Sequence, residues 1–223
     1  NNMSKVFCDE LGVKPDINFN VGSGTHAEQL AKLFIETEKS IKEYNPNMII
    51  VIGDTNSSMG ISFMARRMNV PIAHIEAGCR EFFIKYNDNQ IEFIRNINTM
   101  NYVEEVNRVV IDRCSTLLFT PTITDYNNLK KEDVLGKIYF SGDITYDSFL
   151  SEHNKVKNVK PLFNEEYNLI TLHRAETIDC KERITPIIEA LIESKTNTVF
   201  PMHPRTLKTL KDNGLYSKLL NSK

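Results

Sequence analysis

The sequence has no cluster of basic residues, few cysteines and no long apolar run, and each absence narrows the possible functions. Lys and Arg are scattered, the formal net charge is -2 and the pI is near 6.3, so nothing indicates binding to nucleic acid or to an anionic membrane. The cysteines lie far apart with no paired spacing, which favours reduced thiols over a disulfide framework or a zinc site. They are Cys8, Cys79, Cys114 and Cys180.

No apolar stretch approaches the roughly 20 residues that a membrane helix requires. Residues 1–12 have neither the charge nor the apolar core of a signal peptide. We therefore expect a soluble, cytoplasmic protein. With 223 residues, 41% of them hydrophobic and 25% charged, the chain can bury a core and has room for one domain, or for one and part of another.

Short β-rich runs alternate along the chain with longer stretches of helical periodicity. This alternation predicts an α/β fold with Rossmann-like, doubly wound parallel sheets. Near-continuous Ile, Val and Leu in the best strands indicates strands covered on both faces. The predicted strands are 48–53, 70–76, 117–121, 137–141, 168–172 and 198–202, and the predicted helices are 25–44, 104–115, 122–131, 181–194 and one between the first two strands.

A polar stretch, 151–166, has no strong periodicity and is interpreted as the crossover between two units. We place the domain boundary there, with an N-terminal domain over 1–155 and the first part of a C-terminal domain over 156–223. The Asn-rich segment 81–101 is interpreted as an insertion that forms a mobile loop or lid.

Two carboxylates follow the first two predicted strands, Asp54 in IIVIGD and Glu76 in IAHIEAG. Because a βαβ unit makes both strands run the same way, these side chains emerge together at the carboxyl edge of the sheet, where open α/β sheets bind ligands. This favours a small-molecule enzyme. Structural alternatives remain open: Asp54 can cap the following helix, and Glu76 can pair with Arg80.

The motif VEEVNR places Glu104, Glu105 and Arg108 at the start of a predicted helix. An intrahelical ion pair is the structural alternative to a role in a site. His74 lies inside a predicted strand, so a hydrogen-bonded core histidine is the favoured interpretation.

A second group of candidates follows the later strands. His173, Arg174 and Glu176 come directly after the strand 168–172, and His203 follows the next strand in FPMHPR. The planar guanidinium of arginine can donate two hydrogen bonds to one phosphate group, and the histidine ring can donate one or two N–H groups, depending on its protonation state. Both side chains therefore suit the binding of a diphosphate. The structural alternative for His203, between two prolines, is a rigid turn.

Six motifs occur in the order and approximate spacing of one family: GDTNSSMG, VPIAHIEAGCR, EEVNR, GDITYDSFL, LITLHRAET and VFPMHPR. The chain resembles, along nearly its whole length, the non-hydrolysing UDP-N-acetylglucosamine 2-epimerases. The resemblance implies a two-domain GT-B fold with the UDP-sugar bound between two Rossmann-like domains. It also implies a homodimer that supplies precursors for surface polysaccharide.

The family's reaction interconverts UDP-N-acetylglucosamine and UDP-N-acetylmannosamine. The C2 proton is removed while UDP leaves C1, and the glycal is reprotonated on its other face as UDP returns; no cofactor or metal is needed. A hydrolysing relative and a truncated non-catalytic relative remain alternatives. The residues predicted as catalytic are Asp54, Glu76, Glu104 and His173, and those predicted to bind substrate are Arg80, Arg108, Arg174, Glu176 and His203.

The sequence also departs from the family pattern. It opens after the family's first strand–turn–helix unit and ends before its last third. Between Arg80 and Glu104 it has 23 residues where the family uses a much shorter link. Val103 replaces a proline and Thr177 an asparagine. We therefore expect a fragment of a longer protein or a truncated relative, which by itself binds UDP-sugars poorly and turns over little.

Overall fold

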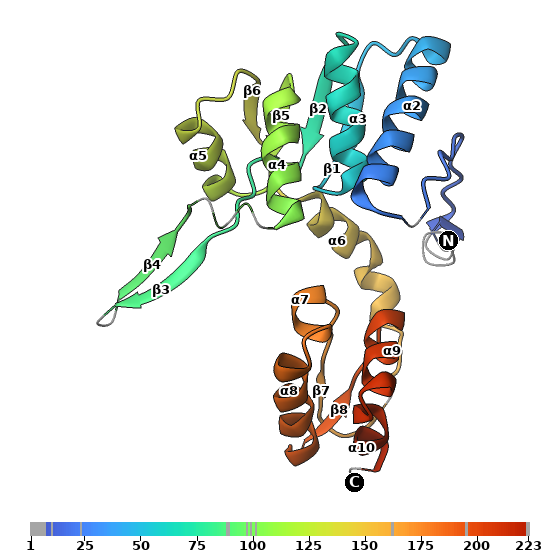
Figure 1. Ribbon diagram of the computed structural model, residues 1–223, viewed down its shortest axis with the longest axis vertical. Coiled ribbons are helices and arrows are strands. Elements are labelled where there is room, and N and C mark those ends of the chain that lie inside the picture. The colour runs from blue at the N-terminus through green and yellow to red at the C-terminus, as the bar shows by residue number, and fades with distance from the viewer. Residues whose placement is uncertain are drawn as a thin grey trace. The chain divides into compact units, whose positions relative to one another are not determined.

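The computed structural model describes residues 8–221 except 10, 23, 88, 89, 97, 99, 101, 162 and 195. The chain divides into two compact units, Asn1–His153 and Asn154–Lys223, and each contains a parallel sheet (Figure 1). The α/β class predicted from the sequence is confirmed, whereas the domain limits 1–155 and 156–223 stay a prediction. In the described part of the chain, no helix is both long enough and apolar enough to cross a membrane.

The first unit is built on a four-stranded parallel sheet in the order β1-β2-β5-β6. The end of β1 lies beside the end of β2, with Ile52 paired to Ile75. Residues that follow these two strands are therefore neighbours at one edge of the sheet. The elements are α2 His26–Tyr44, β1 Ile49–Ile52, α3 Asn56–Arg67, β2 Ile72–Ile75, β3 Phe83–Asn87, β4 Gln90–Ile94, α4 Val103–Cys114, β5 Leu117–Thr120, α5 Ile123–Lys131, β6 Lys137–Phe140 and most of α6 Ile144–Val156, whose last residues belong to the second unit.

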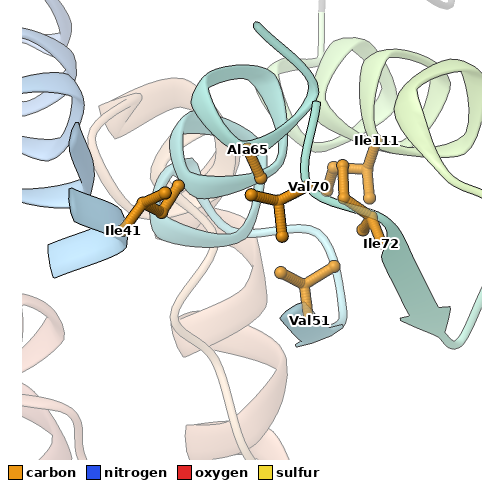
Figure 2. Packing of buried hydrophobic residues seen from close by; sticks show 6 residues of the cluster. All are labelled: Ile41, Val51, Ala65, Val70, Ile72 and Ile111. Atoms are coloured by element: carbon orange, nitrogen blue, oxygen red, sulfur yellow. The ribbon is translucent and has the colours of Figure 1, made fainter. Parts of the chain in front are cut away.

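The core of this unit lies between one face of the sheet and the helices α2 to α5. A cluster of buried side chains joins β1 and β2 to α2, α3 and α4 (Figure 2), and a second joins β5 to α5. Each buried Ile or Val in such a cluster contributes about 1.5–3 kcal/mol. The residues of the first cluster are Ile41, Val51, Ala65, Val70, Ile72 and Ile111.

The other face of β1 is open. Ile50 and Ile52 alternate with buried Val51 and are 64% and 54% exposed. The prediction that the apolar strands are covered on both faces is therefore wrong for β1, although it fits β2, in which Ile72, Ala73 and His74 are all buried. An apolar sequence shows that both faces of a strand can be buried. Which faces other elements bury is seen only in the packing of the helices against the sheet.

Two segments differ from the prediction. Within 81–101, β3 and β4 pair as an antiparallel hairpin, so the predicted loop is wrong for these strands. Polar and apolar residues alternate within the two stretches FIKYN and QIEFI, which is a strand pattern that the Asn-rich composition obscured. Helix α6 runs to Val156, so the segment interpreted as aperiodic from 151 onwards begins as helix.

The second unit has a two-stranded parallel sheet of β7 and β8. Its core is a separate apolar cluster around Ile184, Ile188 and Leu210, with all three fully buried. The elements are β7 Tyr167–Leu169, α7 Ala175–Ile178, α8 Lys181–Glu193, β8 Asn197–Val199, α9 Pro204–Asp212 and α10 Leu215–Asn221.

Candidate active site

Asp54 leaves the end of β1 just before α3 begins. The N-cap of α3 is Thr55, whose hydroxyl accepts the backbone N–H of Ser58 at 3.2 Å. The alternative role of Asp54 as the cap is therefore wrong, and its carboxylate is available for other partners.

The partner of Asp54 is Arg108 in α4. Two guanidinium nitrogens of Arg108 contact the same Asp54 oxygen, Nε at 2.8 Å and Nη2 at 2.7 Å. Burial by itself would lower the pKa of Arg108, but the charge of Asp54 and its hydrogen bond raise it. Asn107, the preceding residue, donates to the backbone carbonyl of Asp54 at 2.8 Å. Asn107 was not among the predicted site residues, although it lies inside the motif EEVNR.

Glu76 follows β2 in a left-handed conformation with φ of +71°. Such a conformation costs a residue other than glycine about 1–3 kcal/mol and occurs often at functional sites. A Cβ atom placed on Gly53 would lie 3.1 Å from a carboxylate oxygen of Glu76, so this carboxylate lies close to the backbone that carries Asp54. The sheet edge therefore brings Asp54 and Glu76 together.

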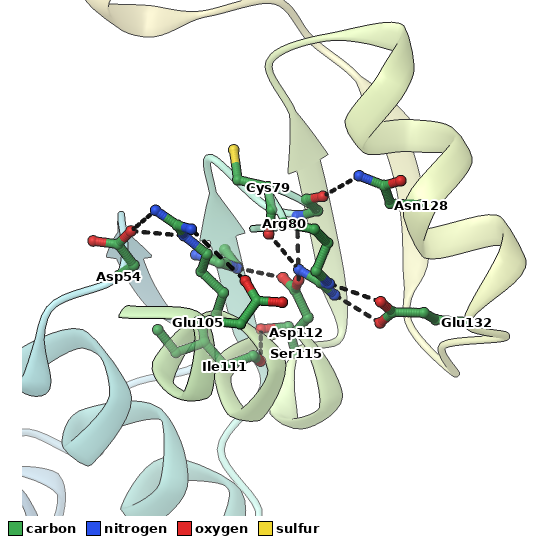
Figure 3. Close-up of polar contacts among 12 residues, drawn as sticks. Asp54, Cys79, Arg80, Glu105, Ile111, Asp112, Ser115, Asn128 and Glu132 are labelled. Atoms are coloured by element: carbon green, nitrogen blue, oxygen red, sulfur yellow. Dashed lines mark hydrogen bonds and ion pairs between the residues drawn. The ribbon is translucent and has the colours of Figure 1, made fainter. Parts of the chain in front are cut away.

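Arg80 is not the partner of Glu76, so that alternative is wrong. Its side chain is only 1% exposed and makes a bidentate pair with Glu132 at 2.7 Å and 2.7 Å and a bond to Asp112 at 2.7 Å (Figure 3). Burial alone would lower the pKa of Arg80, but these two carboxylates raise it. Since every guanidinium nitrogen bonds within the protein, the predicted role of Arg80 in binding substrate does not fit its placement.

Asp112, a residue of α4, contacts the segments that carry Asp54 and Glu76, directly or through His74. Its carboxylate bonds Nδ1 of His74 at 2.6 Å and accepts the backbone N–H of Gly78 at 3.2 Å. The other ring nitrogen of His74 lies 3.1 Å from the carbonyl oxygen of Gly53. The prediction of a hydrogen-bonded core histidine is confirmed, and this chain of contacts fixes the turns before Asp54 and after Glu76.

The paired glutamates of α4 face different environments. Glu104 is exposed in the first helical turn, one turn before Arg108. Glu105 is fully buried, and its carboxylate oxygen lies 3.7 Å from Arg108, so the intrahelical pair is present. Glu81, which was not among the predicted site residues, places a further carboxylate 3.6 Å from Arg108. In the sequence, the only indication that Glu81 belongs to the site was that it directly follows Arg80.

Cys79 lies in the same turn as Gly78. Burial, assisted by the charge of Asp125, raises the pKa of the Cys79 thiol to about 12. The thiol is therefore neutral near pH 7 and does not serve as a nucleophile.

The remaining candidates belong to the second unit, where they follow β7 and β8. His173, Arg174 and Glu176 are exposed around the start of the short helix α7. His203 caps α9, with its Nδ1 accepting the backbone N–H of Arg205 at 3.2 Å. Because β7 and β8 are parallel neighbours, these residues lie beyond the same edge of this unit's sheet.

Among the residues that the structure describes, no three His, Cys, Asp or Glu side chains gather as metal ligands. Asp54, Glu76 and Arg108 thus form a compact polar group at the carboxyl edge of the first sheet. It contains two carboxylates that can accept or donate protons, and a guanidinium that is bonded to one of them.

Comparison with known proteins identifies the same family that the motifs indicate. The family model described as UDP-N-acetylglucosamine 2-epimerase matches residues 1–221. A UDP-N-acetylglucosamine 2-epimerase of Methanocaldococcus jannaschii is 37% identical over 236 residues, covering 100% of this chain and 60% of that protein. A UDP-2,3-diacetamido-2,3-dideoxy-D-glucuronate 2-epimerase of Pseudomonas aeruginosa is 36% identical, covering 96% of this chain and 58% of that protein.

The solved structures agree. The crystal structure of the Methanocaldococcus jannaschii UDP-GlcNAc 2-epimerase in complex with UDP-GlcNAc and UDP is similar with a TM-score of 0.83 and 35% identity, covering 98% of this chain and 59% of that one. The predicted fold class, Rossmann-like parallel sheets of the GT-B type, is confirmed. The chain spans about three fifths of the length of these relatives.

Proposed function

Since the chain belongs to the UDP-N-acetylglucosamine 2-epimerase family, we propose that the protein interconverts UDP-N-acetylglucosamine and UDP-N-acetylmannosamine. The observation that carries the proposal is the adjacency of Asp54 and Glu76 at the end of two parallel strands, with Arg108 bonded to Asp54. Two carboxylates and a cation at a sheet edge suit proton transfer on an anionic substrate.

In the proposed reaction one carboxylate takes the proton from C2 of the sugar. The electron pair of that C–H bond forms the C1–C2 double bond, and the C1–O bond to UDP breaks. A second carboxylic acid then donates a proton to the opposite face of C2, and a diphosphate oxygen of UDP re-forms the bond to C1. Atoms and charge balance without a redox step.

We assign the proton transfers to Asp54, Glu76 and Glu104. Arg108 is paired with Asp54, and carboxyl groups on the two sides of one sugar ring can serve one as base and another as acid. Glu104 is exposed, one turn from Arg108 on α4, and its assignment rests on the family resemblance.

We assign binding of the diphosphate to the residues that follow β7 and β8 in the second unit. Arg174 offers a planar fork of donors and His173 a ring N–H, and both are exposed. Glu176 and His203 remain proposed substrate contacts.

The homodimer and the cytoplasmic location stay predictions.

A second candidate substrate is a UDP-linked 2,3-diacetamido uronate. The relative from Pseudomonas aeruginosa that carries this name is nearly as similar as the N-acetylglucosamine epimerases. Its substrate shares the C2 acetamido centre, so the same proton chemistry applies and only the contacts to the rest of the ring differ.

The test is incubation of the full-length protein with UDP-N-acetylglucosamine in heavy water. We expect deuterium at C2 and a reversible mixture of two UDP-sugars, and a decrease of kcat by about 100-fold or more for Asp54→Asn. Glu38→Gln, at an exposed pair on α2, is the matched control and should leave kcat unchanged.

Other outcomes separate the alternatives. Free N-acetylmannosamine and UDP would identify a hydrolysing enzyme, and exchange with only the diacetamido uronate would identify the second substrate. Absence of deuterium with both substrates would exclude an epimerase.

A further inference from the structure

The buried carboxylate of Glu105 is held from both ends of the hairpin segment. One of its oxygens accepts bonds from Arg95 Nε at 3.0 Å and Nη2 at 2.8 Å. The other accepts the backbone N–H of Glu81 at 2.9 Å. Glu81 precedes β3 and Arg95 follows β4, so the segment that carries the hairpin is fixed at its base to α4.

Arg108 lies between competing carboxylates. Its Nε and Nη2 contact Asp54, while its Nη1 lies 3.7 Å from Glu105. Glu105 and Arg108 are three residues apart on one helix, which is the spacing of neighbouring side chains. A small rotation of the Arg108 side chain is therefore enough to exchange Asp54 for Glu105.

Glu105 already has a second cationic partner, Arg95. A fully buried carboxylate without a cation is strongly disfavoured, so Glu105 needs a positive partner. Among the residues that the structure describes, the cations within ion-pair distance of Glu105 are Arg95 and Arg108. Arg95 is itself oriented by a second ion pair with Glu132, which also holds Arg80.

We propose that Arg95 is a positioning residue of the candidate active site: by neutralising Glu105, it leaves the guanidinium of Arg108 to Asp54. The segment between Arg80 and Glu104, which is longer than the family's link, thereby contributes to the site through its base. Arg95 acts through Glu105 and Arg108 and contacts neither Asp54 nor Glu76 in the described structure.

The structural test uses the chain as it exists and needs no activity. In Arg95→Gln, the Nε–H of Arg108 should lose its contact with Asp54 and bond Glu105, which nuclear magnetic resonance of the arginine Nε–H groups or a crystal structure detects. Adding Glu105→Gln removes the competing charge, so Arg108 should return to Asp54 in the double variant. Arg108 still bonded to Asp54 in Arg95→Gln would overturn the proposal.

The kinetic test rests on the proposed function and uses the full-length protein. Arg95→Gln should lower kcat about tenfold, within the range of coupled charged neighbours, and the second substitution Glu105→Gln should restore most of the loss. A residue needed only for folding would give additive losses in the double variant, and that result would refute a positioning role. Lys42→Gln, at an exposed pair, is the control and should not change kcat.

Failure of the proposed function and failure of the positioning role of Arg95 would give different results. An inactive wild-type protein would refute the proposed function, whereas the contact partner of Arg108 in Arg95→Gln decides the positioning role in either case. A melting temperature for each variant shows that it is folded.

Discussion

At the scale of single residues, the turn after Glu76 depends on a glycine. Gly78 has a φ of +84°, and a Cβ placed there would collide with the backbone carbonyl oxygen of Asp125. Its backbone N–H is also one of the donors to Asp112. The position therefore requires both left-handed backbone and the absence of a side chain.

Gly142 provides a matched comparison, because it has the same φ of +84°, while a Cβ placed there would meet none of the described residues within 4 Å. We expect Gly142→Ala to lower the free energy of unfolding by about 1 kcal/mol, from backbone strain alone. Gly78→Ala should cost about 3 kcal/mol, since a collision with backbone is added. Chemical denaturation of both variants measures the difference, and equal losses would contradict this account of Gly78.

At the scale of elements, Glu132 links the end of α5 to the turn after β2 and to the base of the hairpin. Its carboxylate pairs with Arg80 and with Arg95. Partial burial by itself would raise the pKa of Glu132, but the bonds and charges of the two arginines outweigh it and lower the pKa below the usual value of 4.5.

The lowered pKa fixes the direction of a pH dependence. A carboxylate with a depressed pKa in the folded protein stabilises it above pH 4.5, and this contribution is lost as the pH falls through the folded pKa. We therefore expect Glu132→Gln to cost about 2 kcal/mol near pH 7, with the difference from the wild type shrinking below about pH 4.5. Denaturation at several pH values measures it.

Glu38→Gln serves as the control for that experiment. Glu38 pairs with Lys42 on the surface of α2, where both side chains are largely exposed. Exposed pairs contribute less than about 1 kcal/mol, so its effect should be small at every pH. A pH-independent loss in Glu132→Gln would contradict the role of its charge.

At the scale of the whole molecule, the two units have separate apolar cores. Ile111 is fully buried in the first core and Ile188 is fully buried in the second. We expect Ile111→Ala and Ile188→Ala each to cost about 2–5 kcal/mol in its own unit, because each substitution leaves a cavity.

Amide hydrogen exchange resolved by residue measures where protection is lost. Since each unit buries its own core, exchange should accelerate only in the unit that carries the substitution. Loss of protection in both units from either substitution would show that they unfold as one.

Local sequence was sufficient to predict most of the strands and helices and their order, although not β3, β4 or α6. Predicted strands such as 48–53 and 117–121 contain the observed Ile49–Ile52 and Leu117–Thr120, and the predicted helix 122–131 contains Ile123–Lys131. Periodicity and caps are properties of neighbouring residues, so they can be read without the fold. The adjacency of Asp54 and Glu76 also followed from sequence, because parallel strands joined by a helix must end at the same edge.

The partners of the charged side chains depend on the fold. Arg80 bonds Asp112, 32 residues away, rather than Glu76, and Arg108 bonds Asp54, 54 residues away. The role of Arg95 at the base of the hairpin also depends on distant partners. An ion pair forms where the fold brings two side chains within a few ångströms, and residue type and spacing do not specify that distance.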